Sequence, residues 1–421
     1  MGIEIALGLT GLSAFIWLFL LLFWGQFWRS DQLLDEALPD KALPDETAGD
    51  RTGDRQGSSL ARWPSVCAVV PARNEAELLP ITLNSLLQQD YPGSFTVILV
   101  DDQSTDGTAA VARTVAQKLS KSDRLQVICS EDLPAGWTGK LWAMDQGTRW
   151  ACQVSPAPDY ILLTDADIEH GPQTLPNLVL KAEQEQLDLT SLMVFLRCKS
   201  FWEKLLIPAF VFFFEKLYPF PWVNDPRRST AAAAGGCILM RRDALTRIGG
   251  ISRIRQALID DCSLAHAVKS SGNPETAPPT GRIWLGLTHS VYSLRPYPDL
   301  STIWNMVART AFTQLGYSPF LLVGTIIGMS LVYLTAPVGL VGGLVVGVYI
   351  GNWTLAFLSL MIWLLMAFAY WPTVRFYRCS PLFAFCLPLI AFLYTLMTVD
   401  SALRHWQGRG GSWKGRVYSA Q

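Results

Sequence analysis

The sequence predicts an α/β domain with a mainly parallel sheet, carried on apolar helices that can cross a membrane. Between residues 63 and 309, short apolar runs alternate with helical stretches, a pattern typical of parallel sheets flanked by helices. Two acidic residues, Asp165 and Asp167, directly follow one of these runs. Long uncharged stretches precede and follow the alternating region, which indicates membrane segments on both sides of it.

The elements of the alternating region follow one another in a regular order. Apolar runs predict buried strands at 66–70, 95–100, 125–129 and 160–164. The stretches between them predict helices at 75–89, 108–119 and 141–151. Strands separated by helices pair in parallel, and such folds bind ligands beyond the carboxyl ends of their strands.

The first uncharged stretch, Ile5–Trp28, is about as long as a membrane-spanning helix. A cleaved signal peptide is the alternative, but it would carry a basic start, a shorter apolar core and a small-residue cleavage site. Here the early charge is Glu4, and the stretch ends in tryptophan followed by Arg29. Because an aromatic belt with a positive flank is typical of a cytosolic membrane boundary, residues 1–29 are expected to be an anchor.

Residues 30–62 are expected to be a flexible linker. The repeated Ala-Leu-Pro-Asp at 37–40 and 42–45 is followed by a run rich in Asp, Arg, Gly and Ser. Such a composition cannot bury a core. The α/β domain is then expected over 63–310.

Residues 311–403 are expected to be a second membrane region. No charged residue occurs between 310 and 374, which leaves room for two spans, and another uncharged run covers 381–399. The basic tail, 404–421, favours the cytosolic side. Three full spans after a cytosolic domain would place that tail outside, so either one segment is re-entrant or interfacial, or 319–350 crosses twice.

Composition excludes some classes of partner. The 421 residues carry a formal net charge of −1, which gives no reason to expect a nucleic acid. Half of the residues are hydrophobic and only 16% are charged, as suits a membrane-associated chain. The eight cysteines form no Cys-x-x-Cys pair and no zinc-ligand spacing, so reduced thiols are expected.

The Asp165–Asp167 pair predicts a cation site. On extended backbone, residues two apart point the same way, so both carboxylates reach one place at the end of the strand. Two like charges held that close repel each other unless a cation lies between them. Hard oxygen ligands suit Mg²⁺ or Mn²⁺, often together with substrate phosphates, although a solvated acidic loop gives the same short pattern.

Two other strands also end in polar residues. The first runs into Pro71, Arg73 and Glu75, and the second into Asp102. Side chains beyond strand ends of an α/β fold can contact a bound base or ribose. The alternative is that the acids of the second loop cap the following helix, and this alternative is preferred for Asp106.

In combination, the motifs P-A-R-N-E, V-D-D-Q-S-T-D-G-T, T-D-A-D and L-I-D-D-C resemble the family 2 glycosyltransferases over residues 64–310. That resemblance implies a GT-A fold, a nucleotide-sugar donor and a divalent metal, Mg²⁺ or Mn²⁺. The stretches G-W-T-G-K-L-W-A-M, at 136–144, and M-V-A-R-T-A, at 306–311, are similar to the hopene-associated glycosyltransferase subgroup.

The resemblance also implies roles for individual residues. Asp167 would be the direct metal ligand on the diphosphate, and Asp165 would face the ribose and the metal. The donor would further be lined by Pro71, Arg73, Glu75, Asp102 and Lys140.

The neighbouring acids Asp260 and Asp261 are the catalytic candidates. Asp261 matches the position of the family's catalytic base, while many relatives have Glu where this chain has Asp260. The alternative is an acidic pair that starts a helix and is stabilised by its dipole. Both interpretations can hold together, since a dipole also keeps a carboxylate ionised.

Polymer-forming members of the family carry a Q-x-x-R-W sequence near their membrane entry. The best counterpart here, Asn305 to Thr310, lacks the tryptophan, which disfavours processive synthesis. Arg309 could meet the leaving diphosphate or could simply flank the membrane. The segment 201–222 is expected to be an interfacial helix beside the site, with a buried core helix as the alternative.

These expectations add up to a membrane-bound, metal-dependent, inverting glycosyltransferase. It would move a single sugar from a nucleotide-diphosphate sugar, most simply a UDP-sugar, to a lipid hydroxyl, with a hopanoid or other polyprenoid as the acceptor class that the resemblance implies. A processive polysaccharide synthase and a carotenoid- or sphingolipid-type glycosyltransferase are the alternatives. The enzyme would be a multi-pass protein of the plasma membrane with a cytosolic catalytic domain.

Overall fold

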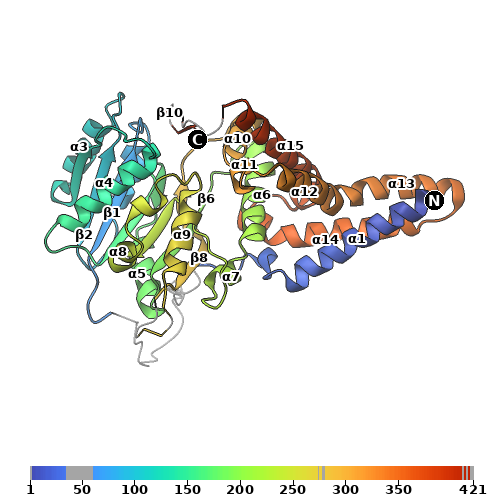
Figure 1. Cartoon of the computed structure of the whole chain (residues 1–421), viewed down its shortest axis with the longest axis horizontal. Coiled ribbons are helices and arrows are strands. Elements are labelled where there is room, and N and C mark those ends of the chain that lie inside the picture. Colours follow the sequence, from blue (N-terminus) through green and yellow to red (C-terminus); the bar gives the residue numbers. More distant parts are fainter. Residues whose placement is uncertain are drawn as a thin grey trace, which may run out of the picture.

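The fold consists of a sheet domain and an arm of apolar helices, as seen in a computed structural model of the chain (Figure 1). The structure describes residues 2–34, 60–273, 275–276 and 280–409, together with the backbone of two short strands at 412–413 and 416–417.

The sheet has eight strands in the described part of the chain, in the order β3-β2-β1-β4-β7-β6-β8-β5. Strands β1 to β4 are mutually parallel, β7 runs antiparallel to both β4 and β6, and β5 runs antiparallel to β8. The strands are β1 (Val66–Ala72), β2 (Phe95–Asp101), β3 (Leu125–Cys129), β4 (Tyr160–Thr164), β5 (Ile168–His170), β6 (Leu189–Phe195), β7 (Cys237–Arg241) and β8 (Ile283–Ser293).

The two faces of the sheet bury two separate cores. In β1, Cys67 and Val69 pack on one core together with α4, while Val66, Ala68 and Val70 pack on the other with α2, α3 and α5. This alternation follows from the two-residue repeat of a strand, and burial on both faces explains why the strand is apolar throughout. The helices of the domain are α2 (Leu79–Leu87), α3 (Thr108–Lys118), α4 (Gly139–Gln153), α5 (Thr174–Gln184), α8 (Arg242–Arg247) and α9 (Asp260–Ser270).

The four predicted strands and three predicted helices are present with small shifts at their ends. The helix expected over 75–89 begins later, at Leu79, because the backbone amide of Glu75 is bound by Thr108 and that of Ala76 by Asp106. Strands β5 to β8 were not predicted. Strand β7 pairs antiparallel with both β4 and β6, so the sheet is mixed rather than mainly parallel beyond β4.

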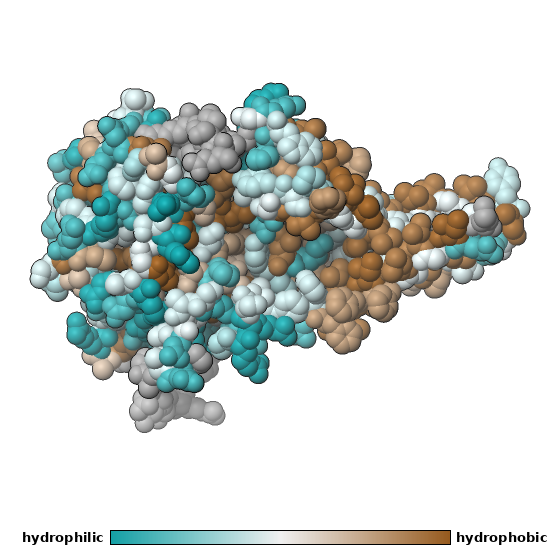
Figure 2. Space-filling view, viewed as in Figure 1, coloured by the Kyte–Doolittle hydropathy of each residue, from teal (hydrophilic) through white to brown (hydrophobic). Residues whose placement is uncertain are grey.

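Within the described residues, four helical segments are long and apolar enough to cross a membrane. They are α1 (Gly2–Phe23), the segment Pro319–Ile350, α14 (Thr354–Phe376) and the segment Pro381–Trp406. The second segment comprises α12 (Pro319–Met329), a π-helical turn η5 (Ser330–Leu334) and α13 (Thr335–Ile350). Figure 1 shows α1, α13 and α14 side by side in the arm, and Figure 2 shows its surface as predominantly hydrophobic.

The π-helical turn η5 is fixed by the first helix. A π turn disrupts the regular hydrogen-bond ladder of a helix, and such turns often mark functional positions. Here the carbonyl of Val332 accepts hydrogen bonds from Trp17 Nε1 at 2.8 Å and Ser13 Oγ at 3.3 Å. The two donors are polar groups of α1, so they also satisfy their own hydrogen-bonding needs inside an apolar arm.

The segment Pro381–Trp406 turns back on itself. Near its start, Phe383 packs against Phe201 beside the sheet domain, and further on the carbonyl of Phe385 accepts from Trp363 in the middle of α14. Its helix α15 (Leu387–Trp406) then returns, and Asp400 accepts a hydrogen bond from Trp304 at 2.7 Å. Both ends of the segment therefore lie on the side of the sheet domain.

Helix α6 (Phe201–Leu217) lies between the sheet domain and the arm, and runs across the direction of the arm (Figure 1). Its middle is buried, including Leu206 and Phe212, and its exposed apolar residues are at its two ends, Phe201 and Leu217. The buried middle of α6 agrees with the core-helix alternative, because protein covers it on both sides. Its position at a membrane interface remains a prediction.

Part of the expected linker packs on the domain. Leu34 is buried, and its backbone amide donates to the carbonyl of Leu287 in β8. Residues 35–59, which carry the Ala-Leu-Pro-Asp repeat, lie outside the described residues. The expected boundaries of the anchor, linker, catalytic domain, membrane region and tail remain predictions.

Candidate active site

The site lies where β1, β2 and β4 end. Because these strands are parallel and β1 lies between the other two, their carboxyl ends form one edge of the sheet. The loop after β4 carries Asp165 and Asp167. The start of antiparallel β7 faces it, since Cys237 pairs with Thr164. The loop after β8 is also adjacent, because the amide of Leu294 donates to the carbonyl of Asp167.

Lys140 links two of the predicted carboxylates. Its Nζ lies 2.9 Å from Oδ1 of Asp165 and 3.2 Å from Oδ2 of Asp260, although these residues are far apart in sequence. Burial acts to lower the pKa of Lys140, but the adjacent carboxylates outweigh it and raise that pKa, so the ammonium stays charged. Lys140 occupies the first turn of α4, directly after the Gly136–Gly139 motif.

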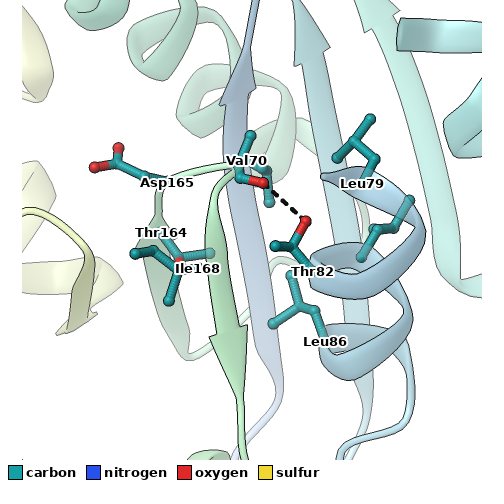
Figure 3. Close-up of a pocket in the computed structure, with 9 residues that line it drawn as sticks. Val70, Leu79, Thr82, Leu86, Thr164, Asp165 and Ile168 are labelled. Carbon is teal, nitrogen blue, oxygen red and sulfur yellow. Dashed lines mark hydrogen bonds between the residues drawn. The ribbon is translucent and has the colours of Figure 1, made fainter. Parts of the chain in front are cut away.

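Asp165 points out of the sheet and away from the hydrophobic residues behind its loop. Figure 3 shows its carboxylate directed away from Leu79 and Leu86 of α2, which line a small pocket. Thr82 of α2 donates to the carbonyl of Ala166 at 2.8 Å. The turn between the two aspartates is therefore held from behind by α2, and Asp165 is left free to meet Lys140.

Asp261 is fixed at the start of α9. Its Oδ2 accepts from the amide of Gly235 at 2.9 Å, and its Oδ1 accepts from the amide of Cys262 at 2.8 Å. Burial, then the charge of Asp260, raises the pKa of Asp261 to about 6. A carboxylate with this pKa is mostly ionised at neutral pH and still basic enough to take a proton. Its position in the first helical turn agrees with the helix-start interpretation as well.

Gly235 is a site residue that the sequence did not single out. A Cβ atom at this position would lie 3.3 Å from Lys140 Nζ and 3.5 Å from Asp261 Oδ2. A larger side chain would therefore fill the space beside both groups. The Gly235-Gly236 pair could have pointed to this position, since glycines at strands often mark a close approach of the backbone to a ligand.

The expected donor-binding residues lie along the first two strand ends. Pro71 is the penultimate residue of β1, and Arg73 donates from Nη1 to the carbonyl of Asp102 at 2.6 Å and to its Oδ2 at 3.5 Å. Asp102 is fully buried. Asp106 accepts from the amides of Ala76 and Thr108, so its structural assignment is supported.

Arg295 was not predicted, yet it joins two predicted residues. Its Nε lies 2.7 Å from Oδ2 of Asp167 and its Nη2 lies 3.4 Å from Oε1 of Glu75. The residue follows β8, an element that the sequence did not reveal, so no strand-end position could be assigned to it. Burial acts to lower the pKa of Arg295, but Asp167 and Glu75 raise it.

Glu203 holds the loop that carries Arg295. It is fully buried at the start of α6, pairs with Arg197 at 2.6 Å and accepts from the backbone amide of Tyr297 at 2.8 Å. It also closes a capping box with Ser200. Glu203, in the first turn of α6, thus fixes the loop that carries Arg295 at the edge of the site.

Arg309 lies at the end of α10 (Leu300–Ala308) and is exposed. Its positive charge acts to lower the pKa of Tyr297, but burial of the phenol outweighs this effect and raises that pKa. Among the described residues, no ion pair involves its guanidinium within 4.0 Å. Both expectations for Arg309, a diphosphate contact and a membrane-flanking charge, remain predictions.

The carboxylates suit a hard divalent cation held partly by substrate. Asp167 and Glu75 share one cationic partner, Arg295, and Asp165 is paired with Lys140. Within the described residues, no three His, Cys, Asp or Glu side chains gather as potential ligands. This donor set fits an ion bound by one or two carboxylates with diphosphate oxygens completing its shell.

Comparison with known sequences agrees with these motifs. Residues 67–249 match the family described as "Glycosyl transferase family 2". A curated relative from Staphylococcus aureus (strain bovine RF122 / ET3-1), named 4,4'-diaponeurosporenoate glycosyltransferase, is 27% identical over 214 residues, covering 50% of this chain and 53% of the relative. The chain thus spans about half the length of this curated relative.

A solved structure resembles the whole chain. The mannosyltransferase PcManGT from Pyrobaculum calidifontis, in complex with GDP-Man and Mn²⁺, aligns over 96% of this chain and 98% of its own, with a TM-score of 0.52 and 18% identity. At that identity the likeness concerns the fold, including the apolar helices. Residues 67–249 are therefore similar to the family 2 glycosyltransferases, and the chain has a GT-A-type α/β fold together with apolar helices that could span a membrane.

Proposed function

We propose that the protein transfers a single sugar from a nucleotide-diphosphate sugar to a hydroxyl group of a lipid, with inversion at the anomeric carbon. One observation carries the proposal: Lys140 bridges Asp165 and Asp260 at the sheet edge, next to Asp261. A fixed cation, a cation-binding pair and a basic carboxylate are the parts that such a displacement requires.

The donor would lie along the ends of β1, β2 and β4. Arg73 would contact the base and buried Asp102 would hold Arg73 in place there, with Pro71 and Glu75 lining the same pocket. Asp165 would face the ribose, and the ammonium of Lys140 would lie close to the charged part of the donor. A UDP-sugar is the proposed donor, and a GDP-sugar is the alternative that the ligand of the similar mannosyltransferase supports.

Asp167, with Asp165, would hold Mg²⁺ or Mn²⁺ against the diphosphate. The ion would supply positive charge to the leaving group, which is the usual role of such a cation in phosphate-bearing sites. Lys140 and Arg295 would add fixed positive charge from the protein. A guanidinium is suited to this because it can donate to two oxygens at once.

Asp261 would act as the general base. The acceptor oxygen attacks the anomeric carbon as the bond to the nucleoside diphosphate breaks, and the hydroxyl proton passes to the Asp261 carboxylate. A single displacement of this kind inverts the anomeric centre. The ammonium of Lys140, which pairs with Asp260, would offset the negative charge of Asp260 beside the base.

A lipid acceptor is supported by the position of the site relative to the apolar helices. Helix α6 and the segment Pro381–Trp406 connect the sheet domain to the arm, so a lipid could present its hydroxyl at the membrane boundary. A hopanoid or another polyprenoid is the proposed class. The protein would be a multi-pass plasma-membrane enzyme with a cytosolic domain, and a re-entrant Pro381–Trp406 would leave the basic tail on that side.

Transfer to a lipid carboxylate is the second candidate. The curated relative is named for 4,4'-diaponeurosporenoate, which makes a carotenoid acid a reasonable acceptor to test. The two candidates differ chemically, because a carboxylic acid is already ionised at neutral pH while an alcohol needs a base. Processive polysaccharide synthesis is disfavoured by the missing tryptophan after Arg309.

The test uses the full chain in nanodiscs with radiolabelled UDP-glucose and GDP-mannose and Mn²⁺. Matched acceptors are retinol and retinoic acid, which differ in the terminal group, together with bacteriohopanetetrol. We expect one labelled sugar per lipid and a preference for an alcohol. Labelled polymer of increasing length would instead support the synthase, and binding of neither UDP nor GDP would contradict any transferase activity.

A further inference from the structure

A four-residue turn, 234–237, lies between the two halves of the candidate site. It is closed by a hydrogen bond from the amide of Cys237 to the carbonyl of Ala234 at 3.2 Å, and Cys237 is also the first residue of β7. Inside the turn, the amide of Gly235 donates to Oδ2 of Asp261 at 2.9 Å. The orientation of the proposed base therefore depends on the position of this turn.

Ser191 of β6 holds both ends of the 234–237 turn. Its Oγ accepts from the amide of Ala234 at 2.9 Å and donates to the carbonyl of Cys237 at 3.1 Å, with the carbonyl of Ala234 at 3.3 Å. Ser191 is completely buried, so these hydrogen bonds are made where solvent cannot replace them. A buried amide that loses its acceptor is destabilising, which makes this hydroxyl important for the shape of the turn.

Thr164, the last residue of β4, holds the same turn from the other side. Its hydroxyl donates to the carbonyl of Gly236 at 2.8 Å and lies 2.9 Å from Nε2 of buried His170. Because the hydroxyl has a single hydrogen, Nε2 of His170 is the donor in the second contact. Thr164 directly precedes Asp165, so the 234–237 turn is tied both to the proposed base and to the strand end that carries the metal-binding pair.

The surroundings of the turn are closely packed. A Cβ atom at Gly236 would lie 2.9 Å from Cγ1 of Val194, and the thiol of Cys262 donates to the carbonyl of Ala233 at 3.7 Å. Interiors of this density resist small displacements. The carboxylate of Asp261 accepts a backbone amide at each of its two oxygens, so its rotation is restricted as long as the turn keeps its place.

Resting on the proposed function, we infer that Ser191 is a positioning residue: its hydroxyl fixes the 234–237 turn, and the amide of Gly235 thereby keeps Asp261 aimed at the hydroxyl of the lipid acceptor. A general base must lie within hydrogen-bonding reach of the proton that it takes, and small displacements slow the reaction. The same amide also favours the ionised form of the base, because a hydrogen bond donated to a carboxylate stabilises its charge.

The experiment compares the wild type with Ser191→Ala, which removes the hydroxyl and leaves the strand apolar. The full chain is assayed in nanodiscs with the donor, UDP-glucose or GDP-mannose, and the alcohol, retinol or bacteriohopanetetrol, that the wild type uses best. We expect kcat on the plateau of the pH profile to fall about tenfold, since transfer depends on the placement of the base. The dissociation constant for UDP or GDP should be unchanged.

The pH profile gives a readout that a loss of stability alone would not move. Without the amide of the turn, the ionised carboxylate is less favoured, so the pKa of Asp261 rises and the midpoint of kcat/KM should move upward by about one pH unit. Asp260 and Lys140 act on Asp261 through their charges, and burial raises the pKa values of Cys262 and Tyr218, which stay neutral. The variant changes none of these groups.

Thr190→Val is the matched control. Thr190 precedes Ser191 in β6 and is equally buried, and among the described residues its hydroxyl has no hydrogen-bond partner. Because no hydrogen bond is lost, kcat should stay within about twofold of the wild type and the pH midpoint should not move. Ser191→Cys keeps a weak donor and acceptor, so its effects should be smaller than those of Ser191→Ala, and it provides the same test if Ser191→Ala does not fold.

Three results would overturn the inference. An unchanged kcat and pH midpoint in Ser191→Ala, with an active wild type, would remove Ser191 from the positioning of the base and leave the proposed function standing. Equal changes in Ser191→Ala and Thr190→Val would show a general effect of packing in β6. A wild type that binds nucleotide but transfers sugar to no lipid alcohol would contradict the proposed function and this inference together.

Discussion

Arg295 binds the Asp167 carboxylate at 2.7 Å, so the residue expected to hold the metal is already paired with a cation of the protein. The same guanidinium contacts Glu75, which lies on a different strand end. A single side chain from beyond β8 thus neutralises two acids that would otherwise repel each other and the donor diphosphate.

Arg295→Ala should weaken binding of UDP or GDP by about tenfold or more, because the site loses positive charge and leaves two carboxylates unbalanced. Isothermal titration in the presence of Mn²⁺ measures the change. Arg227→Ala is the control, since that arginine is paired with Asp225 and its side chain is 87% exposed. Equal affinities in the Arg295 variant and the wild type would contradict a role for this residue in the donor site.

Asp167→Asn should abolish the part of nucleotide binding that depends on the metal. The amide keeps the shape of the side chain but carries no charge to attract a divalent cation. Titrations with and without Mn²⁺ should differ in the wild type and coincide in the variant. Asp243→Asn, whose side chain is 81% exposed, should behave like the wild type. A metal dependence that survives in Asp167→Asn would assign the ion to another ligand.

The sequence revealed the part of the fold that depends on local patterns. Strands such as β1 are buried on both faces and are therefore uniformly apolar, and helices separate them along the chain. Both the strands and their parallel pairing were therefore predictable. The short strand β5 and the antiparallel β7 have no such flanks. Their places in the sheet depend on distant pairings, such as Cys237 with Thr164.

The grouping of several candidate residues was predictable to a similar degree, while their roles remain predictions. Two motif residues, Asp165 at a strand end and Lys140 in the first turn of α4, are brought within hydrogen-bonding distance of each other. Arg295 could not be found, because a single arginine outside a motif carries no pattern. Its proximity to Asp167 arises from packing between elements far apart in sequence.

Transfer to an alcohol should depend on pH through Asp261. Its pKa is raised to about 6, and a general base acts in its deprotonated form. We therefore expect kcat/KM to rise tenfold per pH unit below about 6 and to level off above it. Asp261→Asn should lower kcat by about 10²–10⁴-fold with nucleotide affinity retained. Full activity in that variant would rule out the base assignment.

Lys140→Met should move this acidic limb to higher pH. The ammonium lowers the pKa of Asp261, so its removal leaves the acid harder to ionise in a buried place beside Asp260. The midpoint of the kcat/KM profile should shift upward, and nucleotide affinity should fall because Asp165 also loses its partner. A profile that keeps the wild-type midpoint would mean that the Lys140 charge does not reach the base.

Glu203→Gln should destabilise the fold and weaken donor binding together. The carboxylate is fully buried and pairs with Arg197 while it accepts from the amide of Tyr297. The variant leaves Arg197 without its ionic partner and weakens the acceptor for buried backbone amides, each of which costs about 1–3 kcal/mol when an acceptor is lost. The thermal unfolding midpoint in nanodiscs should fall clearly, and the loop bearing Arg295 should lose its anchor.

Glu185→Gln is the control for Glu203→Gln. That acid pairs with Lys181 on a helix surface, with 43% of its side chain exposed, so its neutralisation should change the unfolding midpoint little. If both variants unfold at the wild-type temperature, the Glu203 network does not stabilise the boundary between α6 and the site. If only Glu203→Gln is destabilised but its nucleotide affinity is normal, the network supports the fold without positioning Arg295.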